Sequence, residues 1–463
     1  MPEFIQFIIE DLAIVISVLL MTYLGYHTLK YYQGSSYKMK DSLSYLKIFY
    51  TKHYYIVILI PFIFILDKWY VQLIYLIYLI VLYFFIRVKK QISKLVYTPR
   101  IIRLIGFMII FYSAIGTILM LLIPFKQLIA LLALYILLMP CLSLLASWIM
   151  HPIEVLINKG YHLQAKRKLK IYNPYVIAVT GSSGKTSVKN YIYDLLRTSM
   201  ITQMSPKSYN TLNGLSKTIN QYLEINNSTL VLEMGATKTG DIEELVNFVP
   251  ANIGIITQIA PQHIRTFQSI EAIVNEKMKL IESLDEKGIA ILNYDCKEIR
   301  DYIIKSPCKV ITIGSTDDCD YYASNIHMTL AGTTFTINNK NNQYNIRTKL
   351  IGKYNIINLI IAFVVAKLMN INDNVITDAI LEIEPVNHRL EIKKDNVITI
   401  IDDSYNSNQL GFKMALEVLN LAQGKKTIIT PGIVDAGDAT EAINYDLAIE
   451  IAKVCDEVIL IDN

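Results

Sequence analysis

Cysteine is scarce in this sequence, and its five cysteines form no recognisable framework. They include no C-x-x-C pair and no cysteine–histidine spacing of the kind that binds zinc. The odd number argues against a disulfide scaffold and fits a reducing compartment. The five positions are Cys141, Cys296, Cys308, Cys319 and Cys455.

Charged residues are also few, at 18% of the 463 residues, whereas hydrophobic residues make up 53%. The chain is too long for one ordinary domain and too apolar to be wholly soluble. The first 150 residues contain 13 Lys and Arg against 5 Asp and Glu, and the remainder contains 31 against 35. The excess of positive charge therefore lies between apolar stretches, where it acts as a topology signal. We predict no nucleic-acid partner.

Five apolar stretches before residue 151 approach the roughly 20 residues that a helix needs to cross a bilayer. The basic connections between them fall on one side, so the positive-inside tendency predicts an external N-terminus and a cytoplasmic second half. We therefore predict a multi-pass protein of the cell membrane that contacts lipid. The predicted spans are Leu12–Leu29, Ile48–Leu66, Trp69–Ile86, Leu104–Pro124 and Leu128–Met150.

In the second half, apolar runs alternate with amphipathic segments of helix length, which predicts an α/β fold with a mostly parallel sheet. Short polar–apolar alternation from Tyr321 to Leu350 predicts an antiparallel extension. The expected strands are Val176–Val179, Leu230–Leu232, Ile253–Ile256, Ile289–Leu292, Val310–Ile313, Val397–Ile401, Thr427–Ile429 and Val458–Ile461. The expected helices are Thr186–Arg197, Asp241–Val246, Ile270–Leu284 and Ile356–Leu368, with others starting at Gly411 and Glu441.

These patterns predict four regions along the chain. A transmembrane helical region covers residues 1–151, and a basic linker covers 152–172. An ATP-binding α/β domain covers 173–385, and a second α/β unit covers 386–463. The last unit holds only about three strands, which is below a comfortable sheet, and we expect it to be incomplete.

The strongest motif lies where the strand ending at Val179 runs into a turn of small residues and then a helix. Glycines there permit close backbone approach, and successive N–H groups and the helix dipole face an anion. The lysine neutralises charge, and the following threonine can hold Mg²⁺. The predicted nucleotide-binding residues are Thr180, Gly181, Ser182, Ser183, Gly184, Lys185, Thr186 and Ser187. A purely structural turn is the alternative interpretation.

The form Thr-Gly-x-x-Gly-Lys-Thr resembles the Mur ligase family, and further segments follow in that family's order. They are Leu230–Ala236, Thr257–His263, Ser269–Lys277, Gly352–Asn358, His388–Glu391 and Asp402–Asn408. Within the family, Glu-Met-Gly-Ala and Asp-Asp-Ser-Tyr-Asn-x-Asn resemble the MurF type, which joins D-Ala-D-Ala to a nucleotide-linked peptide. Tyr209–Asn210 and Asn213–Gly214 fall where that type has its substrate-facing loop, whereas Thr237 replaces its usual Asn.

The resemblance implies a central P-loop domain, a Rossmann-like closing domain and a set of site residues. Two Mg²⁺ ions would be held by Thr186, Glu233, His263 and Lys277, the last modified by carbamylation. The nucleotide would also contact Asn355, Asn358, Arg389 and Asp403. The residues implied in catalysis are Lys185, His263, Lys277 and Arg389.

The implied reaction is ATP-dependent amide-bond formation through an acyl phosphate, in the synthesis of peptidoglycan or a similar envelope polymer. The amine would be D-Ala-D-Ala or an amino acid. Because membrane spans stand where the MurF type has a UDP-binding domain, we expect a lipid-linked or membrane-proximal carboxylate as acceptor. Two alternatives remain: a membrane-anchored ligase for a capsule-type acceptor, and a non-catalytic scaffold that binds nucleotide.

Overall fold

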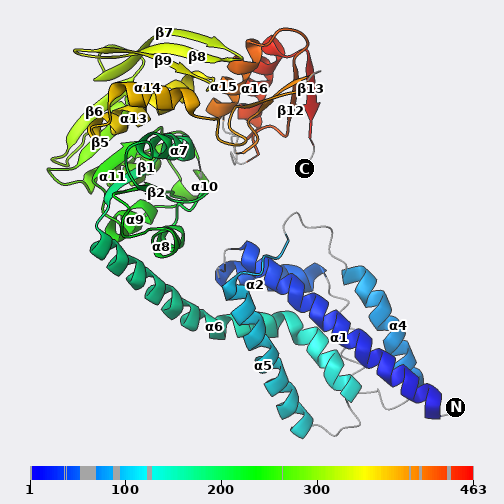
Figure 1. The fold of residues 1–463 in the computed structure, drawn as a ribbon. Helices are drawn as coiled ribbons and strands as arrows, with labels where there is room; N and C mark the ends of the chain where they lie inside the picture. The colour runs from blue at the N-terminus through cyan, green and yellow to red at the C-terminus, as the bar shows by residue number, and fades with distance from the viewer. Residues whose placement is uncertain are drawn as a thin grey trace. The chain divides into compact units, whose positions relative to one another are not determined.

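The protein is described from a computed structural model (Figure 1). The structure describes residues 3–35, 37, 39–52, 69–86, 94–122, 128–262, 264–395, 398–405, 409–434 and 440–461. By its internal contacts the chain divides into two compact units, Met1–Lys159 and Gly160–Asn463. Each unit is considered by itself.

The first unit is helical in most of its described segments. Three helices of the described residues are long and apolar enough to cross a membrane, and they overlap the predicted spans beginning at Leu12, Leu104 and Leu128. The predicted span Trp69–Ile86 forms one helix, whereas Ile48–Leu66 lies mostly outside the described residues. The helices are α1 (Glu3–Gly34), α2 (Met39–Lys52), α4 (Trp69–Ile86), α5 (Pro99–Leu122) and the first part of α6 (Leu128–Tyr172).

Polar side chains tie α5 to α6 in this apolar unit. Arg103 Nε and Nη2 donate to the two carboxylate oxygens of Glu154 at 2.8 and 2.7 Å. The hydroxyls of Tyr112 and Ser143 lie 2.9 Å apart. An unpaired polar group in such surroundings would cost several kcal/mol, on the order of that for transfer into hydrocarbon. Because these polar side chains are paired with one another, they can be accommodated among apolar residues.

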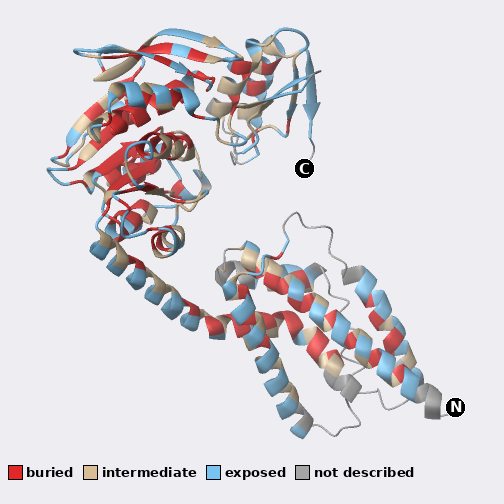
Figure 2. Cartoon of the chain, viewed as in Figure 1, coloured by how far each residue is buried: buried red, intermediate tan, exposed pale blue. Residues whose placement is uncertain are grey.

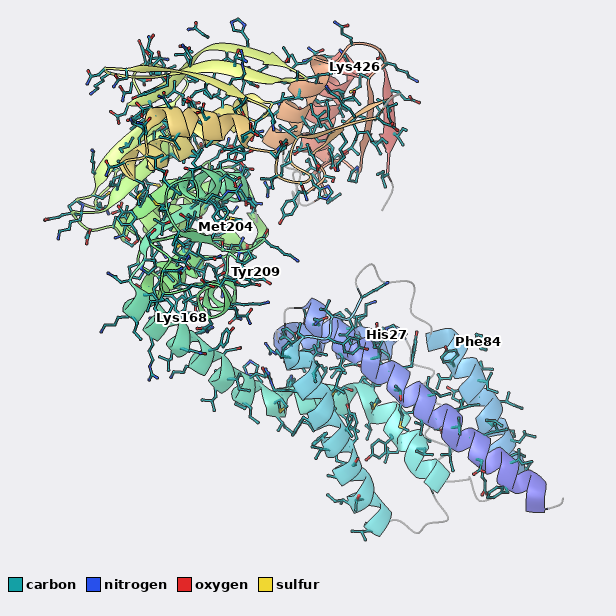
Figure 3. All side chains as sticks on the ribbon, in the orientation of Figure 1. His27, Phe84, Lys168, Met204, Tyr209 and Lys426 are labelled. Atoms are coloured by element: carbon teal, nitrogen blue, oxygen red, sulfur yellow. The ribbon has the colours of Figure 1, made fainter. Side chains whose placement is uncertain are left out.

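Helix α6 continues without a break through residues 152–172, the range predicted as a linker. Pro152 is the last proline before Pro174, so nothing ends the helix earlier by removing a backbone donor. In the second unit its last turns contact α8 (Leu212–Gln221). Lys168, labelled in Figure 3, donates to the carbonyl of Asn220 at 3.0 Å.

The second unit is built on a sheet that has nine strands among the described residues, in the order β2-β3-β1-β4-β5-β6-β7-β8-β9. Strands β1 to β6 pair in parallel, and β7 to β9 form the antiparallel extension that the sequence predicts. Their bounds are β1 Tyr175–Thr180, β2 Thr202–Met204, β3 Thr229–Glu233, β4 Ile253–Ile256, β5 Ile289–Asn293, β6 Lys309–Gly314, β7 Tyr321–Thr329, β8 Gly332–Asn339 and β9 Gln343–Thr348.

Both faces of the sheet are buried around strands β1, β3 and β4, and these strands are accordingly almost continuously apolar (Figure 2). In β1, Ile177 and Val179 join the core under one set of helices, and Val176 and Ala178 join the core under the other. The first set is α7 (Lys185–Leu196), α13 (Lys353–Leu368) and α14 (Asp373–Glu382). The second is the end of α6, α8, α9 (Asp241–Phe248) and α11 (Ile270–Glu282), with α10 (Ile264–Phe267) and α12 (Lys297–Arg300) as short additions.

The remaining residues form two small sheets and two helices. Strands β10 (Glu391–Lys394) and β11 (Thr399–Asp402) are antiparallel, whereas β12 (Thr427–Thr430) and β13 (Glu457–Leu460) are parallel. Helices α15 (Gln409–Asn420) and α16 (Thr440–Val454) share an apolar core that includes Phe412 and Leu447. This region carries the strands and helices expected after Pro385.

Candidate active site

The loop between β1 and α7 is shaped by two glycines with positive φ. Gly181 has φ 153°, and a Cβ there would lie 2.1 Å from Thr257 Oγ1. Gly184 has φ 82°, and a Cβ there would lie 2.1 Å from the Tyr354 hydroxyl oxygen. Neither position accepts a side chain without displacing a neighbour. The motif therefore builds a close-packed loop whose end opens into α7, as a phosphate cradle requires.

Two lysines lie against this loop. Lys185 Nζ donates to the carbonyl oxygens of Gly181 at 2.8 Å and Ser182 at 3.3 Å. Lys277, on α11, is 2% exposed and its Nζ donates to the same Gly181 carbonyl at 3.0 Å. Burial, aided by the nearby charge of Lys185, lowers the pKa of Lys277 to about 7. Two amines that the sequence separates by 92 positions thus converge on one carbonyl.

The carboxylate of Glu233 ends β3 next to the first turn of α7. Thr186 Oγ1 donates to Glu233 Oε2 at 2.9 Å, and Asn210 Nδ2 donates to Oε1 at 3.0 Å. A hydroxyl and a carboxylate are hard oxygen donors of the kind that Mg²⁺ prefers. Thr186 and Glu233 therefore fit the predicted metal site. Predicted ligand His263 lies outside the described residues.

Gly235, two residues after Glu233, lets the Asn210 segment approach the strand end. Its N–H donates to the Asn210 carbonyl at 2.9 Å. A Cβ at Gly235 would lie 2.8 Å from Asn210 Cγ. The Glu-Met-Gly-Ala motif thus combines a carboxylate with a glycine that makes room for the asparagine bonded to it.

The two asparagines of α13 differ in what they contact. Asn355 is engaged within the protein, because its Oδ1 accepts from the Tyr191 hydroxyl at 3.0 Å and its Nδ2 donates to the Ile351 carbonyl at 2.8 Å. Asn358 is 1% exposed, and its Nδ2 has no hydrogen-bond partner among the described residues. Its Oδ1 lies 3.0 Å from where a Gly184 Cβ would stand. Of the pair, only Asn358 keeps a buried donor beside the loop.

Arg389 reaches the site from the segment that follows α14. Its Nη2 donates to Thr186 Oγ1 at 3.3 Å, and its guanidinium lies 4.4 Å from the centre of the Tyr405 ring. The residues on either side, His388 and Leu390, have φ values of 60° and 48°. Such left-handed geometry costs a non-glycine residue about 1 kcal/mol. This backbone directs the Arg389 side chain toward the phosphate loop.

Asp403 is half-buried and lies close to Arg389. Its Oδ1 accepts from the Leu390 N–H at 3.2 Å. Burial raises the pKa of the Asp403 carboxyl to about 6, against the opposing effects of the Leu390 N–H and the charge of Arg389. Asp403, a predicted nucleoside contact, thus lies where ionisation of its carboxyl destabilises the folded protein.

Two cavities meet beside Thr186, Ser208, Arg389 and Tyr405, which line both. The first has a volume of about 360 Å³ and the second about 740 Å³. Seven predicted residues line the first cavity: Ser182, Ser183, Gly184, Lys185, Thr186, Glu233 and Arg389. The other described residues of the prediction line neither: Thr180, Gly181, Ser187, Lys277, Asn355, Asn358 and Asp403.

Sequence reasoning missed Lys189, which lines the second cavity and lies 3.9 Å from Glu233. Its position four residues after Lys185 is the signal, because that spacing places both lysines on one face of a helix. His388, Glu391 and Asp402 also gather within 4.8 Å of one another. Lys393 already bridges both carboxylates at 3.1 and 2.6 Å, so this group is neutralised without a metal.

Comparison with known proteins agrees with this geometry. The family model of the Mur ligase middle domain matches residues 179–366. The UDP-N-acetylmuramoyl-tripeptide–D-alanyl-D-alanine ligase of Bacillus subtilis is 28% identical over 285 residues, which are 61% of each chain. The same-named protein of Escherichia coli is 27% identical over 281 residues, covering 60% of this chain and 62% of that one. The chain thus spans about three fifths of these relatives.

Solved structures show the same fold. A MurF structure from Acinetobacter baumannii has a TM-score of 0.60 at 21% identity, covering 66% of this chain and 68% of that one. A Thermotoga maritima MurF structure in complex with ADP has a TM-score of 0.59 at 23% identity, covering 65% and 69%. Residues 179–366 thus match the middle domain of the Mur ligases, on a fold similar to that of the MurF structures. Helices long and apolar enough to span a membrane precede this domain.

Replacing Gly184 with alanine should weaken both nucleotide binding and folding. The new Cβ would meet the Tyr354 hydroxyl at 2.1 Å, in addition to the cost of a positive φ. Gly424→Ala is a matched control, because Gly424 has φ 89° and nothing within 4 Å of its Cβ. We expect Gly424→Ala to cost only about 1 kcal/mol. Thermal unfolding with and without nucleotide would measure both, and equal effects of the two substitutions would contradict the steric argument.

Replacing Asp403 with asparagine should stabilise the protein above pH 6. An acid whose folded pKa is raised destabilises the fold once it ionises, so the cost is absent below the ordinary pKa of 3.8 and complete above about 6. We expect a gain of at most about 3 kcal/mol at pH 7.5 and little at pH 4. Thermal unfolding across this pH range is the measurement. A variant that is less stable than the parent at pH 7.5 would show that the favourable contacts of the Asp403 carboxylate outweigh the cost of burying its charge.

Proposed function

We propose that this protein is an ATP-dependent ligase that joins a carboxylate to an amine in the synthesis of the cell envelope. The convergence of Lys185, Lys277, Thr186 and Glu233 around one glycine-rich loop carries the proposal. Three cationic or metal-binding groups and a buried carboxylate at one helix start are suited to phosphoryl transfer. The match to the Mur ligase middle domain and the similarity to D-Ala-D-Ala ligases support the same reaction class.

In the proposed reaction, an oxygen of the acceptor carboxylate attacks the γ-phosphorus of ATP, and the bond to the β-phosphate oxygen breaks to release ADP. The amine nitrogen then attacks the carbonyl carbon of the acyl phosphate. The carbon–oxygen bond to phosphate breaks, and the nitrogen loses a proton. The first step brings two anions together, and the second develops negative charge on the acyl-phosphate oxygen, so positioned positive charge is the main requirement. Lys185 in the loop provides it.

Mg²⁺ would neutralise the charge that develops on the phosphates. Thr186 and Glu233 would hold one ion, and Lys277 and His263 a second, with Lys277 carbamylated. The buried position of Lys277 and its pKa of about 7 support this, because a neutral amine reacts with carbon dioxide whereas an ammonium does not. Asn358 and Asp403 would contact the nucleoside. Arg389 would move from Thr186 to the phosphates, while Tyr405 beside it excludes water.

A ligase must couple ATP hydrolysis to the presence of both other substrates. We expect ADP release by the full chain to require an acceptor and D-Ala-D-Ala, and Lys185→Ala to slow it by at least about a hundredfold, the usual cost of losing one group that stabilises developing charge. Lys277→Arg should also fail, because arginine keeps the charge but cannot form the carbamate. Coupled ADP assays and mass spectrometry of the product would measure this.

The control for these substitutions is Lys287→Ala, which removes an exposed lysine from a loop away from both cavities. Its rate should equal that of the parent. A protein that binds ATP but releases ADP at a rate independent of acceptor and amine would instead support the scaffold alternative.

We propose further that the first unit holds the ligase at the cytoplasmic face of the membrane, where the acceptor is a lipid-linked envelope precursor. Three described helices are long and apolar enough to span a bilayer, and basic residues lie between the apolar stretches. The domain limits would be 1–151, 152–172, 173–385 and 386–463. A capsule-type acceptor would use the same site.

The acceptor can be identified by comparing the turnover of two acceptors in purified membranes. ATP and D-Ala-D-Ala would be supplied with either soluble UDP-muramoyl tripeptide or its lipid-linked counterpart, and products would be followed by mass spectrometry. We expect faster turnover of the lipid-linked acceptor, because two-dimensional confinement raises its concentration near the site. Equal or faster turnover of the soluble compound would overturn the membrane-acceptor proposal while leaving the ligase assignment intact.

A further inference from the structure

Lys189 is a buried cation to which the proposed reaction gives no part. It lies on α7 one turn after Lys185, and its side chain is 1% exposed. Burying an ammonium is costly unless hydrogen bonds and an opposite charge compensate it. The contacts of Lys189 therefore indicate the role of this residue.

Those contacts join α7 to one loop and one carboxylate. Lys189 Nζ donates to the carbonyl oxygens of Ser205 at 2.8 Å and Lys207 at 2.5 Å. It also lies 3.9 Å from Glu233 Oε2. An ammonium has three donors and no acceptor, so it can hold two carbonyls and face a carboxylate at the same time.

The loop concerned, Ser205–Asn210, is called here the Asn210 loop. Lys189 holds its first half, and its end is fixed where Asn210 Nδ2 donates to Glu233 Oε1 at 3.0 Å. Lys207 has φ 48°, a conformation that persists in a non-glycine residue only when its surroundings enforce it. Ser208, between the two tethers, lines both cavities. Lys189 thus fixes backbone that forms part of the cavity wall.

Glu233 is shared between this lysine and the proposed metal. Arg389, which donates to Thr186, and Lys185 in the loop add further positive charge in the same region. A cation fixed 3.9 Å from a metal-ligand oxygen repels a divalent ion bound to that oxygen. Removing it should therefore strengthen metal binding even as it releases the loop.

We propose that Lys189 is a positioning residue with two effects: it holds the Asn210 loop against α7, and it weakens the binding of Mg²⁺ at Glu233. This rests on the proposed function in so far as that function assigns Glu233 to the metal. Loss of Lys189 should therefore change loop stability and metal affinity in opposite directions. Loss of Lys189 loosens the wall of the cavities and tightens the metal, whereas a general loss of structure would weaken both.

The test uses the full chain in detergent with Lys189→Met, which keeps an unbranched side chain of similar length without the charge. Amide hydrogen exchange in the Asn210 loop should become at least about tenfold faster, since two backbone tethers are lost. Mn²⁺ affinity, titrated by electron paramagnetic resonance with a non-hydrolysable ATP analogue, should rise about tenfold. Lys189→Arg should keep the Mn²⁺ affinity of the parent.

Lys453→Met is the matched control, because Lys453 donates to Glu450 at 2.9 Å within α16, and neither residue belongs to the Asn210 loop. It should change neither measurement. Lys189→Gln provides the same charge test should Lys189→Met fail to fold. Unchanged loop exchange, or an Mn²⁺ affinity that is unchanged or weaker, would overturn the inference, as would parent Mn²⁺ binding that survives Glu233→Gln. Absence of ligase turnover in the parent would count against the proposed function alone.

Discussion

The buried carboxylate of Glu233 is the interaction on which the geometry of the site depends. It is 2% exposed and ends a central strand, where a charge without partners would be strongly unfavourable. Its partners come from two other segments: Thr186 and Lys189 from α7, and Asn210 from the loop after β2. Satisfying this one charge fixes the phosphate helix, the strand end and the loop relative to one another.

The fold was largely predictable because its signals are local. A buried parallel strand such as β4 is a continuous apolar run, and an amphipathic helix such as α11 repeats its apolar residues every three or four positions. Residues 152–172 show where local reasoning falls short. Their basic composition predicted a linker, yet no further proline follows Pro152 in this range, so the helix continues. Two of its lysines, Lys166 and Lys168, donate to backbone carbonyls on α9 and α8 of the second unit.

The site was predictable only where one residue type implies one role. Thr186 and Glu233 offer oxygen atoms of the kind that Mg²⁺ prefers, and the structure brings two of these atoms within 2.9 Å of each other. Asn355 came from the same motif as Asn358, but its amide is used by Tyr191 and Ile351. Lys189 was missed because its spacing from Lys185 indicates only a shared helix face, whereas its partners are backbone carbonyls of a distant loop. The burial of Asp403 likewise depends on how later segments pack.

The glycine loop has a consequence for how a nucleotide would associate. Thr257 Oγ1 donates to the Ser183 carbonyl at 2.5 Å, and the Tyr354 hydroxyl donates to Ser183 Oγ at 2.9 Å, so protein contacts hold the loop from two sides. Its conformational entropy is therefore lost during folding and not when the phosphates arrive. Association would resemble the docking of two rigid bodies, limited by diffusion and desolvation, with little loop ordering left to slow it.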